Sequence, residues 1–228
     1  MIEIVLVRHA EPDWEPGGRA VDEPVLTGRG LRQAECVVDA LGEERFDHIY
    51  VSPLPRAQQT AAPLLARLGN SAKTEPWLAE FGLPSLEGRT SEEVQRFFER
   101  AMRRDMDQWW EALPGGEAFR DFCARIDGGL REVLARHGIQ EGEDGGHRIW
   151  QAAETDLRLL IVAHQGTNAV IVSHLLGGEP LPWTWLGFRN CHAGISRLHT
   201  LRAASGSIWA LDYLNRVTHL APIGELTY

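Results

Sequence analysis

The first apolar segment of the chain is short and β-branched, and it ends at two polar residues. Residues 2–7 read Ile-Glu-Ile-Val-Leu-Val, and Arg8 and His9 follow directly. A run of this length and composition predicts a strand that is buried on both faces. Pro12 and its acidic neighbours cannot continue such a strand, so the strand should end near Arg8.

Other short apolar runs recur along the chain between turn-forming residues. They predict further strands over residues 48–51, 73–75, 157–162, 194–201 and 208–214, with the last two joined as a hairpin. Apolar residues at helical spacing predict helices over residues 27–41, 57–68, 91–110, 117–137 and 167–176. Thr27 can cap the first of these helices, and Thr167 or Asn168 the last. The acidic, glycine-rich stretch 140–146 is predicted to be a loop.

Strands that alternate with helices favour an α/β fold. We expect a three-layer α/β/α sandwich with a mostly parallel central sheet, formed by one domain over residues 1–228. The two amphipathic helices between residues 81 and 138 lie between predicted strands. We interpret residues 81–138 as a helical cap inserted into that domain, packed over the rim of the sheet.

Composition and charge exclude several classes of function. The formal net charge is -9, which argues against general nucleic-acid binding. The chain contains no apolar stretch long enough for a membrane helix and no pattern of a secretory signal, so we expect a cytoplasmic protein. The three cysteines are far apart and fit no disulfide framework. Oligomeric state stays open, although the C-terminal residues 217–228 could form a homodimer interface.

Three predicted strands deliver cationic or imidazole side chains at their carboxyl ends. The first delivers Arg8 and His9, the second leads into Arg56, and a late strand delivers His164. Parallel strands present their carboxyl ends at the same edge of a sheet, so these four side chains should converge. Two guanidinium groups and two imidazoles make a pocket suited to phosphate.

Phosphoryl transfer would need a nucleophile and an acid beside such a pocket. The imidazole of His9 can attack phosphorus, and the surrounding cations can stabilise charge on the phosphoryl oxygens. Glu80 follows the third predicted strand and is the candidate proton donor to the leaving oxygen. Glu75 and Glu87 are nearby alternatives for that role.

Seven segments now resemble a known family. They are, in chain order, LVRHAEPDWE, PVLTGRGLRQA, SPLPRAQQTA, LAEFGLPSLEG, PGGEAF, VAHQGTNAV and FRNCHAGISRL. They resemble the ordered motifs of the histidine phosphatase superfamily, also called the phosphoglycerate-mutase-like family, and extend from residue 4 to about residue 198. The first and last segments and SPLPRAQQTA are the specific ones.

The resemblance implies roles for individual residues. It implies that His9 accepts the phosphoryl group, that Arg8, Arg56 and His164 bind it, and that Glu80 donates a proton and then activates water. It implies a small phosphorylated substrate and neither a metal nor another cofactor.

The chain also departs from the family pattern at several positions. Ala10 replaces a common Gly, Glu15 stands where many members have a phosphate-binding Asn, Gln165 replaces a Gly, and Leu86 a Trp. A carboxylate at position 15 would repel an anionic substrate such as a phosphate ester. We therefore name as further candidates for substrate contact Glu15, Thr27, Gln165 and His192.

The favoured function is a metal-independent phosphomonoester hydrolase that acts through phosphohistidine on His9. A phosphoglycerate-type mutase and a catalytically weak member that binds a phosphorylated ligand are the alternatives. A zinc hydrolase is disfavoured because the histidines have no ligand-like spacing.

Overall fold

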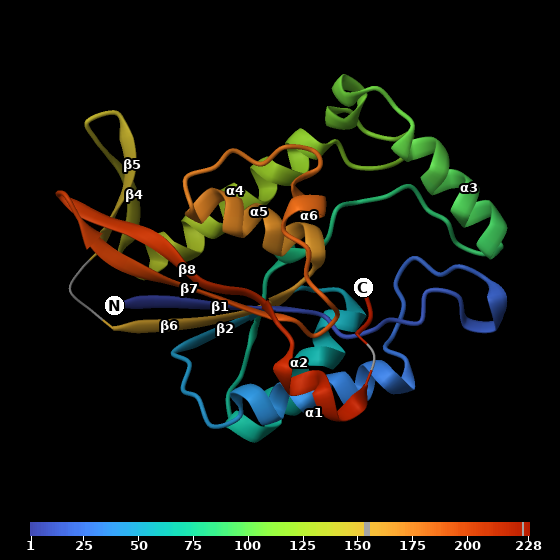
Figure 1. Cartoon of the computed structure of the whole chain (residues 1–228), viewed down its shortest axis with the longest axis horizontal. Helices are drawn as coiled ribbons and strands as arrows, with labels where there is room; N and C mark the ends of the chain where they lie inside the picture. Colours follow the sequence, from blue (N-terminus) through green and yellow to red (C-terminus); the bar gives the residue numbers. More distant parts are fainter. Residues whose placement is uncertain (153–155, 225) are drawn as a thin grey trace.

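The computed structural model describes residues 1–152, 156–224 and 226–228, and its centre is a mixed sheet (Figure 1). The strands of this described part form one eight-stranded sheet in the order β3-β2-β6-β1-β7-β8-β5-β4. Their bounds are β1 (Ile2–Arg8), β2 (His48–Val51), β3 (Lys73–Thr74), β4 (Ile139–Asp144), β5 (His147–Ala152), β6 (Leu157–Ala163), β7 (Ile195–Ala203) and β8 (Gly206–Arg216).

The expectation of a mostly parallel sheet was wrong. Neighbours are parallel from β3 through β2 and β6 to β1, whereas β1, β7, β8, β5 and β4 pair antiparallel. For two of these antiparallel pairs the reason is the length of the connection. The strand pairs β4–β5 and β7–β8 are hairpins with two-residue turns, and a turn this short can join only antiparallel strands.

The hairpin of β4 and β5 also replaces the loop expected over residues 140–146. Asp144 pairs with His147, and the turn residues Gly145 and Gly146 have φ angles of 61° and 83°. Consecutive positive φ angles are what a tight hairpin turn requires and what glycine adopts without strain. The two glycines therefore mark the turn of a hairpin.

Helices cover both faces of the sheet (Figure 1). The α-helices are α1 (Gly28–Leu41), α2 (Pro55–Leu68), α3 (Ser91–Met102), α4 (Phe119–Arg136), α5 (Gln165–Leu175) and α6 (Thr184–Gly187). Four short 3-10 helices in the described residues are η1 (Pro16–Gly18), η2 (Pro76–Leu78), η3 (Met106–Trp110) and η4 (Thr218–Ile223). None of the described helices is long and apolar enough to cross a membrane.

The alternation of side chains along the central strands divides the core into two clusters. Val5 and Val7 of β1 pack in one cluster with residues of α1 and α2. Ile4 and Leu6 point to the other face and pack with residues of α4 and α5. Successive residues of a strand point to opposite faces, so one apolar run supplies both layers of the sandwich.

The predicted cap contains helices in two different environments. The helix expected to run through residue 110 ends at Met102, and Asp105 begins η3 as a new N-cap. Helix α3 contains no buried residue and lies away from the sheet (Figure 1). In contrast, Phe122, Ile126 and Leu130 of α4 are fully buried against the sheet. Residues 81–138 thus include one projecting helix and one helix of the sandwich.

Candidate active site

The register of the parallel strands brings the predicted cluster together. Arg8 at the end of β1 pairs with Ala163 of β6, and Val51 of β2 pairs with Val162. The residues that follow these strands, including His9 and His164, therefore lie side by side at the carboxyl edge of the parallel strands. The ring centroids of His9 and His164 are 5.1 Å apart.

His9 has a defined tautomer. The residue is 3% exposed to solvent, and its Nδ1 lies 2.8 Å from the carbonyl oxygen of Ala10. A carbonyl only accepts, so Nδ1 carries the hydrogen and Nε2 keeps its lone pair. Burial, followed by the nearby His164 and Arg8, lowers the pKa of His9 well below its usual value. The ring is thus neutral, as a nucleophile must be.

His164 is held by the hydroxyl of Ser52, the residue that follows β2. Its Nε2 lies 2.6 Å from the hydroxyl of Ser52, and both side chains are fully buried. Burial, then the charges of Arg56 and Arg8, lowers the pKa of His164 well below its usual value. Its Nδ1 has no hydrogen-bond partner in the described part of the chain. Ser52 therefore fixes the ring and leaves the other nitrogen free for a ligand.

The two predicted arginines differ in how much of their donor capacity is used. Arg8 donates from Nη1 to the carbonyl of Asn190 at 2.5 Å and from Nη2 to Nε2 of His192 at 3.0 Å. Burial lowers its pKa to about 10, so it stays cationic. Arg56 is 4% exposed, and among the described residues its Nε and Nη1 find no acceptor. Unsatisfied buried guanidinium donors are costly and are typical of an anion site.

The ring of Trp14 lies beside this second guanidinium, with the Arg56 carbon Cζ 4.9 Å from its centroid. Such a cation–π contact holds the guanidinium plane without using its N–H donors. The Trp14 side chain thus orients Arg56 and leaves its donors available for phosphate oxygens.

His192, a candidate for substrate contact in the sequence analysis, lies beside Arg8 and His9. Its ring centroid is 5.4 Å from that of His9. Burial, followed by Arg8 and Arg56, lowers the pKa of His192 to about 3. The neutral ring accepts from Arg8 at Nε2 and donates from Nδ1 to Thr227 Oγ1 at 2.9 Å. It therefore orients Arg8.

Glu80 reaches the site across the N-terminus of α5. Its carboxylate accepts from the backbone N–H groups of Gly166 at 2.9 Å, Thr167 at 3.1 Å and Phe81 at 3.0 Å. His164 is the N-cap of α5 and makes no side-chain cap bond, so the expected cap by Thr167 or Asn168 was wrong. Instead, the carboxylate of Glu80 caps α5 from another segment of the chain. The first N–H groups of a helix have no partner within the helix, and the helix dipole attracts negative charge to this end.

A partly buried ion pair supports the backbone around Glu80 and was missed by the sequence analysis. Arg125 of α4 makes two hydrogen bonds to the carboxylate of Glu117, at 3.0 and 2.8 Å. The same guanidinium donates to the carbonyls of Trp77 and Ala79 at 2.9 and 3.0 Å. The PGGEAF segment, which supplies Glu117, was the only signal in the sequence for this support.

The alternative carboxylates have other partners. Glu75 pairs with Arg136 at 2.7 Å, and Glu87 accepts from the backbone N–H of Asp22 at 3.0 Å. Burial lowers the pKa of Arg8 and Arg56, and in both cases the charge of Glu80 is the strongest opposing influence. Of the three carboxylates considered, Glu80 is the one that interacts with both arginines.

Two of the remaining candidates have local structural contacts. Thr27 caps α1 by accepting from the Gly30 N–H at 2.9 Å and donates to the carboxylate of Glu11 at the same distance. Gln165 accepts from the N–H of Asn190 at 2.8 Å and so supports the carbonyl that binds Arg8. Both residues therefore act on the backbone around the cluster.

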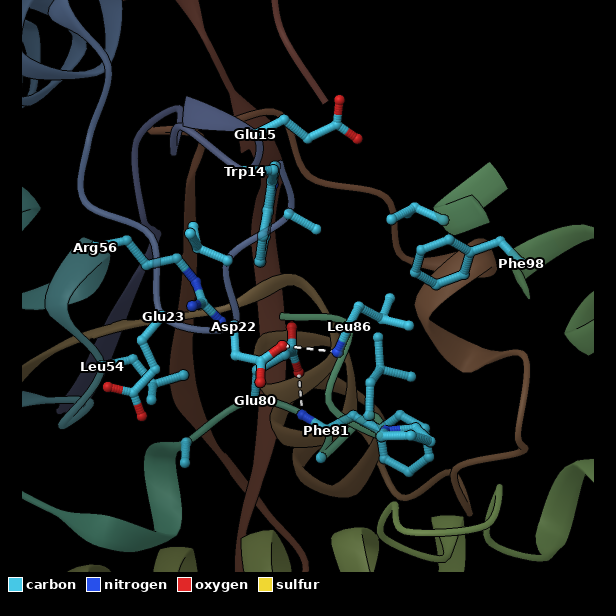
Figure 2. A pocket seen from close by; sticks show the side chains of 17 residues that line it. Trp14, Glu15, Asp22, Glu23, Leu54, Arg56, Glu80, Phe81, Leu86 and Phe98 are labelled. Carbon is cyan, nitrogen blue, oxygen red and sulfur yellow. Dashed lines mark hydrogen bonds between the residues drawn. The ribbon is translucent and has the colours of Figure 1, made fainter. Parts of the chain in front are cut away.

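Glu15, the most conspicuous departure from the family pattern, contacts the cap. Its carboxylate accepts a hydrogen bond from the hydroxyl of Ser91, the first residue of α3. This contact ties the loop after β1 to α3. The carboxylate is thereby drawn towards the helix N-terminus, where negative charge is favourable. Figure 2 shows Glu15 separated from Arg56 by the ring of Trp14.

A pocket of about 630 Å³ opens beside Arg56 and Glu80 (Figure 2). Its walls come from the loop after β1, from the segment that follows Glu80 and from α3. Arg56 and Glu80 link this pocket to the cluster, which combines a neutral imidazole, unsatisfied cationic donors and a carboxylate. This combination can bind a phosphoryl group and exchange a proton with its substituent. In the described part of the chain, no group of His, Cys, Asp or Glu side chains is arranged to hold a metal ion.

Curated relatives include both phosphatases and mutases. The chain is 33% identical over 143 residues to Phosphoserine phosphatase 1 of Hydrogenobacter thermophilus, covering 61% of this chain and 68% of the relative. It is 28% identical to a probable phosphoglycerate mutase of Enterobacter sp. (strain 638), covering 96% and 95%.

Solved structures and a family match complete the comparison. The glucosyl-3-phosphoglycerate phosphatase of mycobacteria is 26% identical, with a TM-score of 0.69 and coverage of 94% of this chain and 99% of the other. A structure named Mycobacterial hydrolase 1 is 27% identical, with a TM-score of 0.71 and coverage of 94% and 98%. Residues 4–205 match the family described as Histidine phosphatase superfamily (branch 1). With this family match over most of its length, and with the motifs and fold described above, the chain belongs to the histidine phosphatase superfamily.

Proposed function

We propose that the chain hydrolyses phosphomonoesters through a phosphohistidine at His9, without a metal. The observation that carries this proposal is the tautomer of His9. Its Nδ1–H is bound to the Ala10 carbonyl, which leaves the Nε2 lone pair available beside Arg56 and His164. A neutral nucleophile among unpaired donors is what transfer of a phosphoryl dianion requires.

The first step forms the covalent intermediate. The lone pair of His9 Nε2 attacks phosphorus while the bond from phosphorus to the ester oxygen breaks. Arg8, Arg56 and His164 donate to the phosphoryl oxygens. The leaving oxygen takes the electron pair of the broken bond and a proton from the carboxyl group of Glu80.

The second step reverses the roles. Glu80, now a carboxylate, takes a proton from water, and the water oxygen attacks the phosphorus of phosphohistidine. The bond from phosphorus to Nε2 breaks and returns its electron pair to His9. Inorganic phosphate leaves, and the starting tautomer of His9 is restored.

The acidic character of the pocket favours a hydrolase, which transfers the phosphoryl group to water, over a phosphoglycerate-type mutase. A mutase must hold a carboxylate of its substrate as well as the phosphoryl group, which calls for a second cationic site. Arg56 is the one cationic residue among those lining the 630 Å³ pocket, and it already serves the phosphoryl group. A hydrolase does not have that requirement.

The proposal is tested by hydrolysis of p-nitrophenyl phosphate in excess chelator, with wild type and His9→Ala side by side. We expect wild-type turnover to survive chelation and the variant to lose about a thousandfold or more in kcat/KM. Labelled substrate should leave an acid-labile, base-stable label on wild type alone. Inactivity of wild type on several phosphate esters would favour a phospho-ligand-binding member, and faster isomerisation of phosphoglycerate than phosphate release would favour a mutase.

The role of Glu80 is tested by leaving-group dependence. Glu80→Gln keeps the shape but cannot donate the proton, so an alkyl phosphate should suffer by about a hundredfold or more. p-Nitrophenolate leaves without protonation, so the first step with that ester should be nearly unaffected in a single turnover. Equal losses with both esters would argue that Glu80 only shapes the N-terminus of α5.

A further inference from the structure

The pocket beside Arg56 and Glu80 is much larger than a phosphoryl group needs. Its volume of about 630 Å³ lies within the range of sites that enclose a drug-sized ligand. Figure 2 shows Leu86, Phe81 and Phe98 on one side and Arg56 and Trp14 on the other. The pocket therefore has room for a bulky group attached to the phosphate.

The wall of this pocket is apolar and partly open to solvent. Trp14, Leu83 and Phe98 line it with 46%, 40% and 42% of their surfaces exposed. Large apolar side chains that remain exposed together usually mark a binding surface. Phe98 comes from α3, which contains no buried residue, so the chain does not use this side chain for its own core.

The charges around the pocket disfavour a substrate that carries a negatively charged group besides its phosphate. Four of its lining residues are acidic, namely Glu15, Asp22, Glu23 and Glu80. The single cation, Arg56, belongs to the phosphate cluster. A carboxylate on the substrate would therefore lose hydration and meet like charges without a partner.

Two of these carboxylates are fixed in place by the fold. Asp22 accepts from the backbone N–H of Leu86 at 2.9 Å, and Glu15 accepts from Ser91. Glu23 is exposed and close enough to Arg56 to oppose, after Glu80, the lowering of its pKa by burial. The acidic rim is thus a property of the folded loop after β1 and its contact with the segment after Glu80.

We infer that the physiological substrate is a phosphomonoester of a bulky, predominantly apolar alcohol that carries no additional negative charge. This inference rests on the proposed function, since the phosphoryl group must sit at His9 and Arg56. The apolar group then covers Phe98 and its neighbours, and its transfer out of water supplies binding energy. Esters of carboxylated alcohols such as phosphoglycerates are rejected by the acidic rim.

A matched set of alkyl esters tests the inference, because the reactivity of their leaving oxygens is similar. We would measure kcat/KM for n-propyl phosphate, 3-phenylpropyl phosphate and the phosphate ester of 3-hydroxypropanoate. Burial of the phenyl ring should raise kcat/KM about ten- to a hundredfold over the propyl ester. The carboxylated ester should fall about tenfold below the propyl ester.

Variants on α3 locate the effect. Phe98→Ala should reduce the preference for the phenylpropyl ester over the propyl ester to about threefold or less. Met102→Ala is the matched control, because Met102 is an apolar residue of the same helix, 52% exposed against 42% for Phe98, and does not line the pocket. Glu23→Gln should raise kcat/KM for the carboxylated ester relative to the propyl ester.

The outcomes separate this inference from the proposed function. If no ester is hydrolysed in a reaction that depends on His9, the proposed function fails. If propyl phosphate is hydrolysed through His9 but the phenyl ring brings no gain, or the carboxylated ester is preferred, only the substrate class is overturned. A preference that Phe98→Ala leaves intact would also overturn the assignment to this pocket.

Discussion

The carboxylate of Glu80 lies against the backbone of Gly166, with a hydrogen bond of 2.9 Å from the glycine N–H to Oε2. A Cβ atom at position 166 would lie 2.6 Å from Oε1 of the same carboxylate. Position 166 therefore needs glycine so that the Glu80 carboxylate can approach the backbone closely, and not because of its φ angle. Glu80 comes from the segment after η2, whereas Gly166 is in the first turn of α5.

We predict that Gly166→Ala displaces Glu80 and lowers kcat/KM for an alkyl phosphate about tenfold or more. The matched control is Gly128→Ala in α4, where an added Cβ meets nothing within 4 Å. That control should leave activity unchanged and raise the free energy of unfolding by about 0.5–1 kcal/mol, because alanine is the better helix former. Full activity in Gly166→Ala would mean that the position of Glu80 is not critical.

Arg125 should matter both for stability and for turnover. Arg125→Lys keeps the charge but loses the planar fork that binds Glu117 and the carbonyls of Trp77 and Ala79. We expect a loss of about 1–3 kcal/mol in the free energy of unfolding, measured in urea, because the partly buried Glu117 carboxylate and backbone carbonyls lose donors. We also expect a fall in kcat that is larger for alkyl than for p-nitrophenyl esters, since the support acts through Glu80.

The control for this prediction is on the same helix. Arg131 pairs with Glu141 at 2.8 Å, but its side chain is 52% exposed. Arg131→Lys should therefore change the unfolding free energy by about 0.5 kcal/mol or less. Similar losses in both variants would contradict a special role for Arg125.

Ser52→Ala should weaken the site by releasing His164. The substitution removes the 2.6 Å contact to Nε2 and leaves a buried imidazole nitrogen without a partner. We expect a loss of about 1–3 kcal/mol in unfolding free energy and a rise in the inhibition constant of vanadate, an analogue of the phosphoryl transition state. An unchanged affinity for vanadate would show that His164 needs no positioning by Ser52.

The free energy of unfolding should fall as the pH is lowered from about 6.5 to 5. The pKa values of His9, His164 and His192 are all lowered in the folded chain, the last to about 3. The unfolded chain therefore binds these protons first, and stability that is complete above pH 6.5 is lost below it. Each such histidine contributes up to about 1.4 kcal/mol per pH unit.

The pH effect can be measured by urea unfolding at pH 7, 6 and 5, above the range in which most carboxylates titrate. His192→Gln, which keeps an acceptor for Arg8, should reduce the slope by one histidine. His147→Gln, at the exposed first residue of β5, is the matched control for replacing a histidine outside the cluster. A slope that is the same in all three proteins would rule out His192 as a neutral buried group.

The local chemistry of the site could be predicted from the sequence because it depends on where apolar strands end. The β-branched runs before Arg8 and His164 determine both the burial of the strands and the exit point of those side chains. The order of the motifs then indicated a phosphoryl-transfer family. The cap of α1 by Thr27 and the bounds of β2 also follow from short-range patterns, and the structure confirms them.

The contacts that orient these residues were decided by tertiary structure. Ser52 follows β2 and His164 follows β6, and Arg125 reaches Glu117 and the Glu80 segment from α4. The sheet also gained antiparallel neighbours because two hairpins pair beside β1, and the pairing of distant strands is not encoded in any local period. The sequence by itself determined which groups meet at the strand ends. Only the packing of separate elements determined the partner of His164, the unpaired donors of Arg56 and the acidic, apolar pocket beside them.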